Sequence, residues 1–201
     1  MLMRNRQTSA FFLLLLIALV CRAADAQTLR LQQAGGTSSR ATLQVGQTIT
    51  IEVHGDLGRV EASGVAFFIT VPSDAFQVVD QGSDANVGVQ PFLQGPLFQG
   101  AGEQINLLIP ESDPASANFE GQQLDYAAVV GAAGNRTRSG SGVIATFRLL
   151  CVRPIVNGRI EVDDNPVRET RLVLPSGEER RFITVRGMEI TVTGLQLRDI
   201  P

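Results

Sequence analysis

The chain has 201 residues, of which 44% are hydrophobic and 18% charged, and its formal net charge is -3 at pH 7. This length suits one compact domain plus an appendage, and the apolar fraction is too high for a disordered chain. One histidine and two cysteines leave almost no material for a metal site or a disulfide framework, and the slight negative charge does not favour nucleic acid as a partner.

The first 26 residues have the pattern of a secretory signal peptide. Arg4 and Arg6 precede an unbroken apolar run from Phe11 to Val20, and Ala24-Asp25-Ala26 places small residues where a signal peptidase cleaves. Ten apolar residues reach only about 15 Å as a helix, half of a hydrocarbon core of about 30 Å. We therefore expect no transmembrane segment, cleavage after Ala26, and a protein that is secreted, periplasmic or held at the cell surface.

A second interpretation of the leader uses Cys21 as the attachment site of a lipid. Bacterial lipoprotein signals usually place Gly, Ala or Ser before that cysteine, whereas here Val20 precedes it. The soluble, cleaved form is therefore the favoured interpretation, with the lipid anchor as its alternative.

The rest of the chain reads as short β-strands separated by turns. Residues 48–54 alternate apolar and polar side chains, and along residues 64–71 a second inward face is formed by Val65, Phe67, Ile69 and Val71. Further strands are predicted at 105–109, 124–130, 143–152, 158–162 and 188–192, with a hairpin over 171–185 that turns at 175–178. About ten short strands without a sustained helical period indicate an all-β fold, a two-sheet antiparallel β-sandwich or jelly roll.

The alternation also predicts which side chains lie between the two sheets: Val65, Phe67, Ile69, Phe147 and Leu149. Cys151 continues this inward face and is the only cysteine outside the leader, so we expect it to be a buried small hydrophobe. His54 is the only histidine, and no catalytic Cys–His pair is expected.

Two segments interrupt the strands, at residues 80–104 and 110–123, and both are rich in Gly, Gln, Asp, Ser and Pro. The first carries Phe92, Leu93, Leu97 and Phe98, which is enough apolar side chain to pack over one end of a sheet. Covering the core is the favoured interpretation of this segment, and a partner-binding loop is the alternative.

The polar residues show no motif for catalysis or for cation binding. Asp163-Asp164 and Glu178-Glu179 are adjacent acid pairs near turns, without the spaced Asp and Asn residues of a calcium loop, so we expect solvated turn acids. Asn135-Arg136-Thr137 fits the glycosylation pattern but is better explained as a polar loop. The sequence therefore predicts no catalytic residue, no cofactor and no metal.

Several strands, in order and spacing, resemble those of the cohesin domain, a jelly-roll module related to some cellulose-binding modules. Residues 45–53, VGQTITIEV, are similar to the opening "VGDTVTVxV" strand, and residues 61–71, EASGVAFFITV, resemble "GLAGFQFTLSY". Residues 76–79, FQVV, fit the "LEFV" that follows, and residues 142–149, GVIATFRL, resemble "GxLATITFxV". The usual "YDP" after the second motif is here replaced by Val71-Pro72-Ser73-Asp74.

This resemblance implies a nine-stranded, cohesin-like jelly roll over residues 27–193, followed by a short tail at 194–201. It also implies a module that binds and performs no chemistry, because cohesins recognise dockerins through one sheet face and adjacent loops. The strand over 62–71 then lies in the partner-binding sheet. Its outward positions are expected to form a flat surface with one exposed ring: Gly64, Ala66, Phe68 and Thr70.

Two features of that surface stay open. Some dockerin-binding cohesins carry Asn and Asp where this chain has Gly64 and Ala66, so those hydrogen-bonding groups are absent here. In the alternative interpretation of Phe68, its ring lies under the loop that carries Phe92 and Phe98.

Three functions are candidates for this chain. The first is a secreted, non-catalytic protein–protein interaction module, at the cell surface or in an extracellular assembly, with a dockerin-like or other protein partner. The second is a carbohydrate-binding module linked to polysaccharide breakdown, and the third, a hydrolase, has no supporting motif. The absence of Trp and the single Tyr favour a protein partner over a polysaccharide, because sugars stack on exposed aromatic rings.

Overall fold

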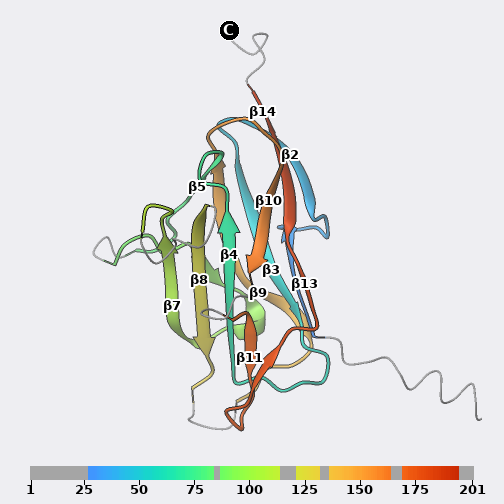
Figure 1. The fold of residues 1–201 in the computed structure, drawn as a ribbon. Helices are drawn as coiled ribbons and strands as arrows, with labels where there is room; N and C mark the ends of the chain where they lie inside the picture. Colours follow the sequence, from blue (N-terminus) through green and yellow to red (C-terminus); the bar gives the residue numbers. More distant parts are fainter. Residues whose placement is uncertain (1–26, 84–86, 114–120, 132–135, 164–168, 195–201) are drawn as a thin grey trace, which may run out of the picture.

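The computed structural model describes residues 27–83, 87–113, 121–131, 136–163 and 169–194. These residues form two β-sheets that face each other, together with one short 3₁₀ helix, η1 (Pro96–Phe98) (Figure 1). The predicted two-sheet, all-β sandwich is confirmed. The predicted signal peptide at 1–26 with Cys21, the tail beyond Gly194, Asp164 and Asn135 lie outside the described residues.

The first sheet has six strands. Five of them follow the order β13-β1-β3-β9-β5, and the sixth, β6, pairs with a different stretch of β9 from the one that pairs with β5. Its members are β1 (Thr28–Gln33), β3 (Thr48–Asp56), β5 (Phe76–Val78), β6 (Phe92–Gln94), β9 (Ser141–Cys151) and β13 (Thr184–Arg186). The centre of this sheet is the long antiparallel pair of β3 and β9, in which Ile51 lies opposite Phe147.

The second sheet has eight strands. Its members are β2 (Arg40–Gln44), β4 (Gly64–Val71), β7 (Gly102–Ile109), β8 (Gln122–Val129), β10 (Ile155–Asp163), β11 (Arg171–Val173), β12 (Glu179–Arg181) and β14 (Met188–Thr193). β4 pairs with β8 along one edge and with both β10 and β11 along the other, and β7 pairs with the far side of β8. β4 is therefore the central strand of this sheet.

The number and direction of the strands differ from the nine antiparallel strands expected. The described residues contain fourteen strands. Part of the excess arises where two short strands lie along one edge of a longer strand: β5 and β6 along β9, and β10 and β11 along β4. Two pairs are parallel, β1 with β13 and β2 with β14.

The predicted hairpin over 171–185 is only half right. β11 pairs with β12, which begins at Glu179, in the expected antiparallel manner across the turn at 175–178. The chain then leaves this sheet, and β13 pairs with β1 in the other sheet. The second half of the predicted hairpin, residues 179–185, is therefore divided between the two sheets. Phe182, between β12 and β13, is buried in the core and does not continue the pairing with β11.

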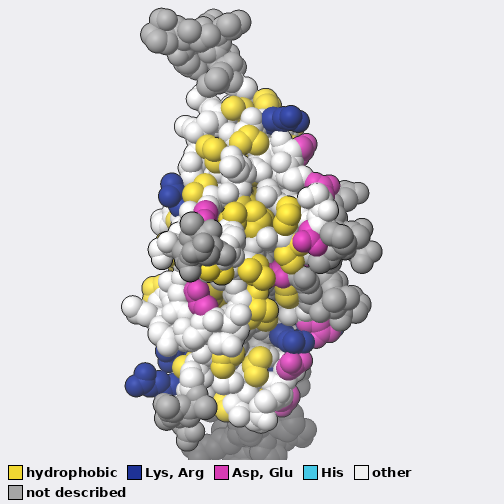
Figure 2. All heavy atoms as spheres, turned by 90° about the vertical axis from the view of Figure 1, so that its left-hand side faces the viewer, with side chains coloured by type: hydrophobic (Ala, Val, Ile, Leu, Met, Phe, Trp, Pro, Cys, Tyr) yellow, Lys and Arg dark blue, Asp and Glu magenta, His cyan; other side chains and the backbone are white. Residues whose placement is uncertain are grey.

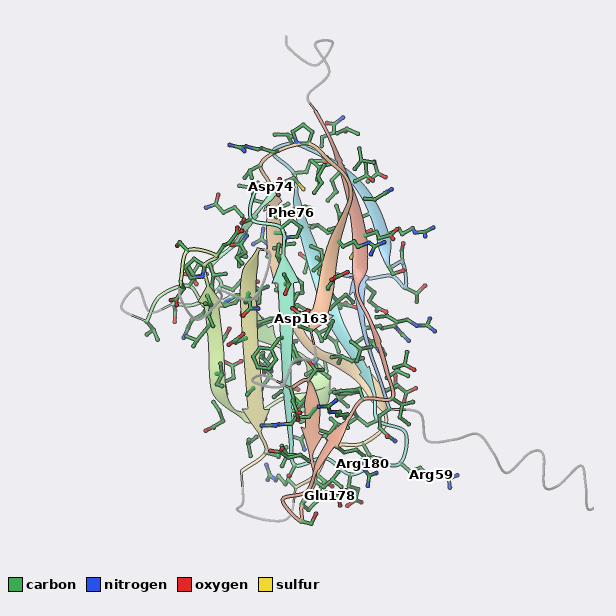
Figure 3. The ribbon with its side chains drawn as sticks, viewed as in Figure 1. Arg59, Asp74, Phe76, Asp163, Glu178 and Arg180 are labelled. Carbon is green, nitrogen blue, oxygen red and sulfur yellow. The ribbon has the colours of Figure 1, made fainter. Side chains whose placement is uncertain are left out.

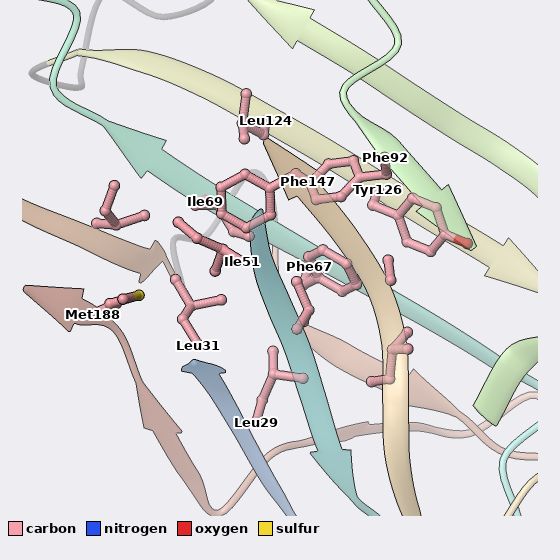
Figure 4. Close-up of a cluster of buried hydrophobic side chains, with 14 of the residues drawn as sticks. Leu29, Leu31, Ile51, Phe67, Ile69, Phe92, Leu124, Tyr126, Phe147 and Met188 are labelled. Atoms are coloured by element: carbon pink, nitrogen blue, oxygen red, sulfur yellow. The ribbon is translucent and has the colours of Figure 1, made fainter. Parts of the chain in front are cut away.

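Buried aromatic rings hold the two sheets together near β6 and β8. The Phe67 ring stacks on the Tyr126 ring at 5.1 Å, and Phe92 meets Phe67 and Phe147 edge-on at 5.4 and 5.6 Å (Figure 4). All five side chains predicted to lie between the sheets are buried, as is Cys151, so the inward faces were assigned correctly. The segment at 80–104 covers the core, since Phe92 and Phe98 are buried within it.

A single side-chain amide joins β6 to β7 across the open side of the sandwich. Asn106 on β7 accepts a hydrogen bond from the Phe92 backbone N–H at 3.0 Å and donates one to the Phe92 carbonyl at 2.9 Å. The amide therefore copies the two bonds of a paired strand and links the six-stranded sheet to the eight-stranded sheet. This link fixes the backbone that carries the Phe92 ring.

Candidate binding face of the eight-stranded sheet

The candidate site is the outer face of the eight-stranded sheet around β4, where the sequence placed Gly64, Ala66, Phe68 and Thr70. Alternation along β4 puts Val65 and Phe67 into the core, so the four candidates point to the outer face. Residues opposite each other on paired strands share a face, and the register therefore shows which side chains surround them.

Three rows of side chains cross this outer face. The first contains Val129, Gly64 and Val173, from β8, β4 and β11. The second contains Ile105, Ala127, Ala66 and Arg171, and the third contains Leu107, Asp125, Phe68 and Asp163. Small residues thus occupy the middle of the first two rows, and longer aliphatic side chains stand on the β7 and β8 side.

The aliphatic side chains on that side are exposed. Ile105, Leu107 and Val129 have 38%, 42% and 41% of their surfaces accessible, and they lie on the adjacent strands β7 and β8. We call these three residues the aliphatic patch. These three side chains give the flat outer face an exposed apolar area, which is a feature that a docking surface for another protein needs. Figure 2 looks at the β7 side of the molecule and shows a band of hydrophobic side chains there.

Gly64 keeps this surface flat. A Cβ atom at position 64 would lie 3.3 Å from Cγ2 of Val129 and 3.4 Å from Cβ of Val173. The two valine side chains therefore close over the glycine backbone, and no larger side chain fits between them without displacing one. The aliphatic surface continues in this way from the patch towards β11.

Phe68 differs from both expectations. Only 8% of its surface is accessible, so it is not the exposed ring predicted for this face. The loop that carries Phe92 and Phe98 does not cover it either, because those rings lie in the core on the opposite side of β4. The ring lies between Asp125 and Asp163 in the register, and the backbone N–H of Phe68 donates to the Thr170 hydroxyl at 3.4 Å.

The end of the face near Thr70 is polar. The Thr70 hydroxyl donates to the carboxylate of Asp163, and the Thr170 hydroxyl donates to the Asp163 carbonyl at 2.6 Å. Burial raises the pKa of Asp163 above its ordinary value, Glu161 adds to this, and the Thr70 hydrogen bond opposes it. Asp163 is thus not a solvated turn acid as predicted, and it lies in the middle of the sheet (Figure 3).

Ion pairs border the face on the β11 and β12 side. Arg171 contacts the carboxylates of Glu169 and Glu179 at 3.4 and 2.9 Å, and Arg181 also contacts Glu169. Glu178, at the far end of the hairpin, pairs with Arg180 at 3.6 Å (Figure 3). The predicted turn acids Glu178 and Glu179 are thus surface residues that pair with arginines.

No catalytic constellation accompanies this face in the part of the chain that the structure describes. Within those residues, no group of three His, Cys, Asp or Glu side chains is arranged to hold a metal ion. His54 lies on the outer face of the other sheet, where burial and the nearby Arg30 lower the pKa of its imidazole. Cys151 is buried, and burial raises the pKa of its thiol.

The described part of the chain also contains no helix that is long and apolar enough to cross a membrane.

Comparisons with known proteins find the fold but no sequence relative. No family model matches the chain, and no curated protein matches it. Among solved structures, a type II cohesin domain from the cellulosome of Acetivibrio cellulolyticus is similar at a TM-score of 0.59 and 13% identity, covering 82% of this chain and 95% of that one.

Two further structures agree. The sixth cohesin of scaffoldin B from Acetivibrio cellulolyticus, in complex with a Cel5 dockerin variant, has a TM-score of 0.55 and 8% identity, covering 84% of this chain and 99% of that one. A non-cellulosomal cohesin from the archaeon Archaeoglobus fulgidus has a TM-score of 0.51 and 14% identity, covering 84% and 91%. The chain therefore has a cohesin-like fold, as the strand motifs predicted.

The sequence placed the candidate face on the strand over 62–71 but did not include the residues that are most exposed on that face. Ile105 and Leu107 were predicted only as part of a short apolar run, and Val129 as part of another strand. The alternation of Ile105, Leu107 and Ile109 was the available signal, because it places three aliphatic side chains on one face of β7. The structure brings this face beside Ala66 and Gly64 through β8.

Proposed function

We propose that the protein is a non-catalytic module that binds another protein on the outer face of the eight-stranded sheet. The observation that carries the proposal is the aliphatic patch, which lies next to the flat surface of Gly64 and Ala66. A flat surface of small residues with a few protruding aliphatic side chains suits docking of a second protein.

The cohesin-like fold supports this proposal. Among the similar structures is a cohesin that was solved together with a dockerin. We propose a protein partner for this chain by analogy, and the chemistry of its own face supplies the independent reason.

The described residues do not favour the carbohydrate-binding alternative. Their eight aromatic side chains, seven Phe and Tyr126, are all buried. A sugar ring therefore finds no exposed aromatic ring on which to stack in this part of the chain. The protein-binding proposal takes precedence for this reason.

We also propose that the leader at 1–26 exports the protein. Cleavage after Ala26 leaves Gln27 at the start of the folded domain, where its carbonyl accepts hydrogen bonds from the N–H groups of Ile183 and Thr184 at 2.8 and 3.2 Å. N-terminal sequencing of the exported protein should find Gln27 first. A lipid-bearing start at Cys21, or an uncleaved chain, would contradict this processing.

Paired substitutions on the two outer faces test the binding face. Leu107 in the patch and Leu93 on the outer face of the other sheet are exposed to a similar degree, 42% and 51%. The exported chain is immobilised, and capture from the secreted fraction of the producing cells is compared for wild type, Leu107→Ser and Leu93→Ser. We expect wild type and Leu93→Ser to capture the same protein and Leu107→Ser to lose it.

Thermal melting of the three chains is the control, because neither leucine is buried and both variants should melt like wild type. Equal capture by both variants, or a loss confined to Leu93→Ser, would contradict the proposed face. Phe68→Ser is unsuitable for this test, because Phe68 is buried and its loss lowers stability.

A further inference from the structure

Residue 27 lies where the proposed leader meets the folded domain. Its carbonyl accepts hydrogen bonds from the N–H groups of Ile183 and Thr184 at 2.8 and 3.2 Å, and β1 begins at the next residue. Cleavage after Ala26 would give this residue, Gln27, a free α-amine. Three carbon atoms separate that amine from the carbon of the side-chain amide, which is the spacing that closes a five-membered ring.

That α-amine would be the only primary amine of the exported chain. The sequence contains no Lys, and all 17 of its basic residues are Arg. An Arg guanidinium stays protonated in proteins and is not a nucleophile. Any reaction of a primary amine with this chain is therefore confined to its first residue.

The side chain of Gln27 points towards the core. Side chains alternate along residues 27–31, and Leu29 and Leu31, on the same side of the strand as Gln27, are fully buried. Phe182, which precedes Ile183, is buried as well, and only 4% of Gln27 is exposed. Residue 27 therefore lies at the edge of the apolar core.

A free first residue places many polar groups at this position. The ammonium carries three N–H donors and a charge, and the side-chain amide carries two more donors and an acceptor. Polar groups withdrawn from water need partners, and an unpaired charge is the most costly of them. Joining the amine to the amide leaves one N–H, one carbonyl and no charge, which suits the buried position of Gln27.

From this position we infer that the exported chain is modified at Gln27, by closure of its first residue to a pyroglutamyl ring. The inference rests on the proposed export and on cleavage after Ala26. The uncharged α-amine attacks the carbon of the side-chain amide, a bond forms between that nitrogen and Cδ, and the bond from Cδ to the amide nitrogen breaks. Ammonia leaves with one proton from the amine, and no oxidant or reductant is consumed. An α-amine has a pKa of about 7.7–8.0, so its uncharged form is available near neutral pH.

The ring is compatible with the pairing of β1, because the carbonyl that anchors residue 27 is not part of it. The ring contains only the backbone nitrogen, Cα, Cβ, Cγ and Cδ, so the carbonyl continues to accept the bonds from Ile183 and Thr184. Pairing with β3 and β13 begins at Thr28 and is unchanged. The closed end withholds from aminopeptidases the free amine that they require.

A persistent ammonium in an ion pair is the alternative, and Asp56 is the acid closest to it in the register. Asp56 lies opposite Thr28, on the outer face of the sheet, whereas the Gln27 side chain points to the inner face. One Asp56 oxygen also accepts the Gly58 N–H at 3.0 Å. This arrangement favours the uncharged ring.

Labelling with an amine-reactive reagent tests the inference, because the chain has no Lys side chain to react. The exported protein is labelled intact in guanidinium chloride, so that a buried amine also reacts, and its mass is measured before any digestion. The matched control is Gln27→Asn, which keeps an amide but would have to close a strained four-membered ring. Pyroglutamyl aminopeptidase then removes the first residue only where the ring is present.

We expect wild type to take up no label and to have the mass of a chain that starts at Gln27 less one ammonia, and Gln27→Asn to take up one label. After the aminopeptidase, wild type should take up one label, at Thr28. A wild-type chain that starts at Gln27 and takes up one label overturns the ring and leaves the proposed export intact. A blocked chain that has lost no ammonia also overturns the ring. A chain that starts at any other residue overturns the proposed cleavage and the ring together.

Discussion

Removing the Asn106 amide should loosen the joint between the two sheets. Asn106→Ala deletes the bond to the Phe92 N–H at 3.0 Å and the bond to the Phe92 carbonyl at 2.9 Å. Each hydrogen bond contributes about 0.5–1.5 kcal/mol net, so the variant should lose about 1–3 kcal/mol of unfolding free energy. Asn106→Asp keeps the acceptor but places a carboxylate against the Phe92 carbonyl and near Glu103, and it should lose at least as much.

Urea unfolding measures this loss, which corresponds to a midpoint lower by about 1 M for a domain of this size. Amide exchange of the Phe92 N–H should become faster in both variants, because β6 then loses its link to β7. Gln104→Ala is the matched control, since Gln104 on the same strand is exposed and bonds only to the Gly102 carbonyl of its own strand. If both Asn106 variants unfold at the wild-type urea concentration and the Phe92 N–H stays protected, the amide does not join the sheets.

Three further measurements test the core and its ionisable groups. Phe147→Ala should cost about 3–5 kcal/mol in urea unfolding, because it empties a fully buried site, and a loss below about 1 kcal/mol would mean that the inward face is wrong. The phenolate absorbance reports Tyr126 alone, since the chain has one Tyr and no Trp, and burial raises the pKa of Tyr126 to about 12. The folded state holds this proton more tightly than the unfolded state does. The stability that the protonated Tyr126 contributes is therefore complete below about pH 10 and is lost as the pH rises through about 12. A titration midpoint of Tyr126 near pH 10 in the folded protein would contradict its burial. Asp163→Asn should raise the unfolding free energy at pH 7 and change little at about pH 3, because burial raises the pKa of this carboxyl and its charged form is disfavoured in the folded state. A variant that is less stable than wild type at pH 7 would show that the bond from Thr70 outweighs burial.

Local alternation predicted the parts of the fold in which one face of a strand meets the core. β3 and β4 follow this rule, and Ile51 and Phe67 are buried as expected. β1 has the same signal in Leu29 and Leu31, both fully buried, but the run is short and was not predicted as a strand. Alternation along a strand therefore identifies its inward face well when it persists over several residues.

Pairing and outer-face burial depend on contacts that no local pattern contains. Phe68 occupies an outward position by alternation, and its burial follows from neighbours on other strands. The division of the last hairpin likewise depends on β13 finding β1 in the opposite sheet. The patch residues Ile105 and Leu107 become part of the candidate face only because β8 places them beside β4.

The parallel pairs β1–β13 and β2–β14 determine when this chain is able to fold. They join the first strands of the domain to the last ones, and Gly187 makes the change of sheet between β13 and β14, where a Cβ atom would collide with the Ile160 carbonyl. Neither sheet is complete until residues 184–193 have emerged, and contacts so distant in sequence make folding slow. Under the export that we propose, this delay would keep the domain open during translocation. A fragment that ends before β13 leaves the edges of β1 and β2 unpaired and prone to aggregate.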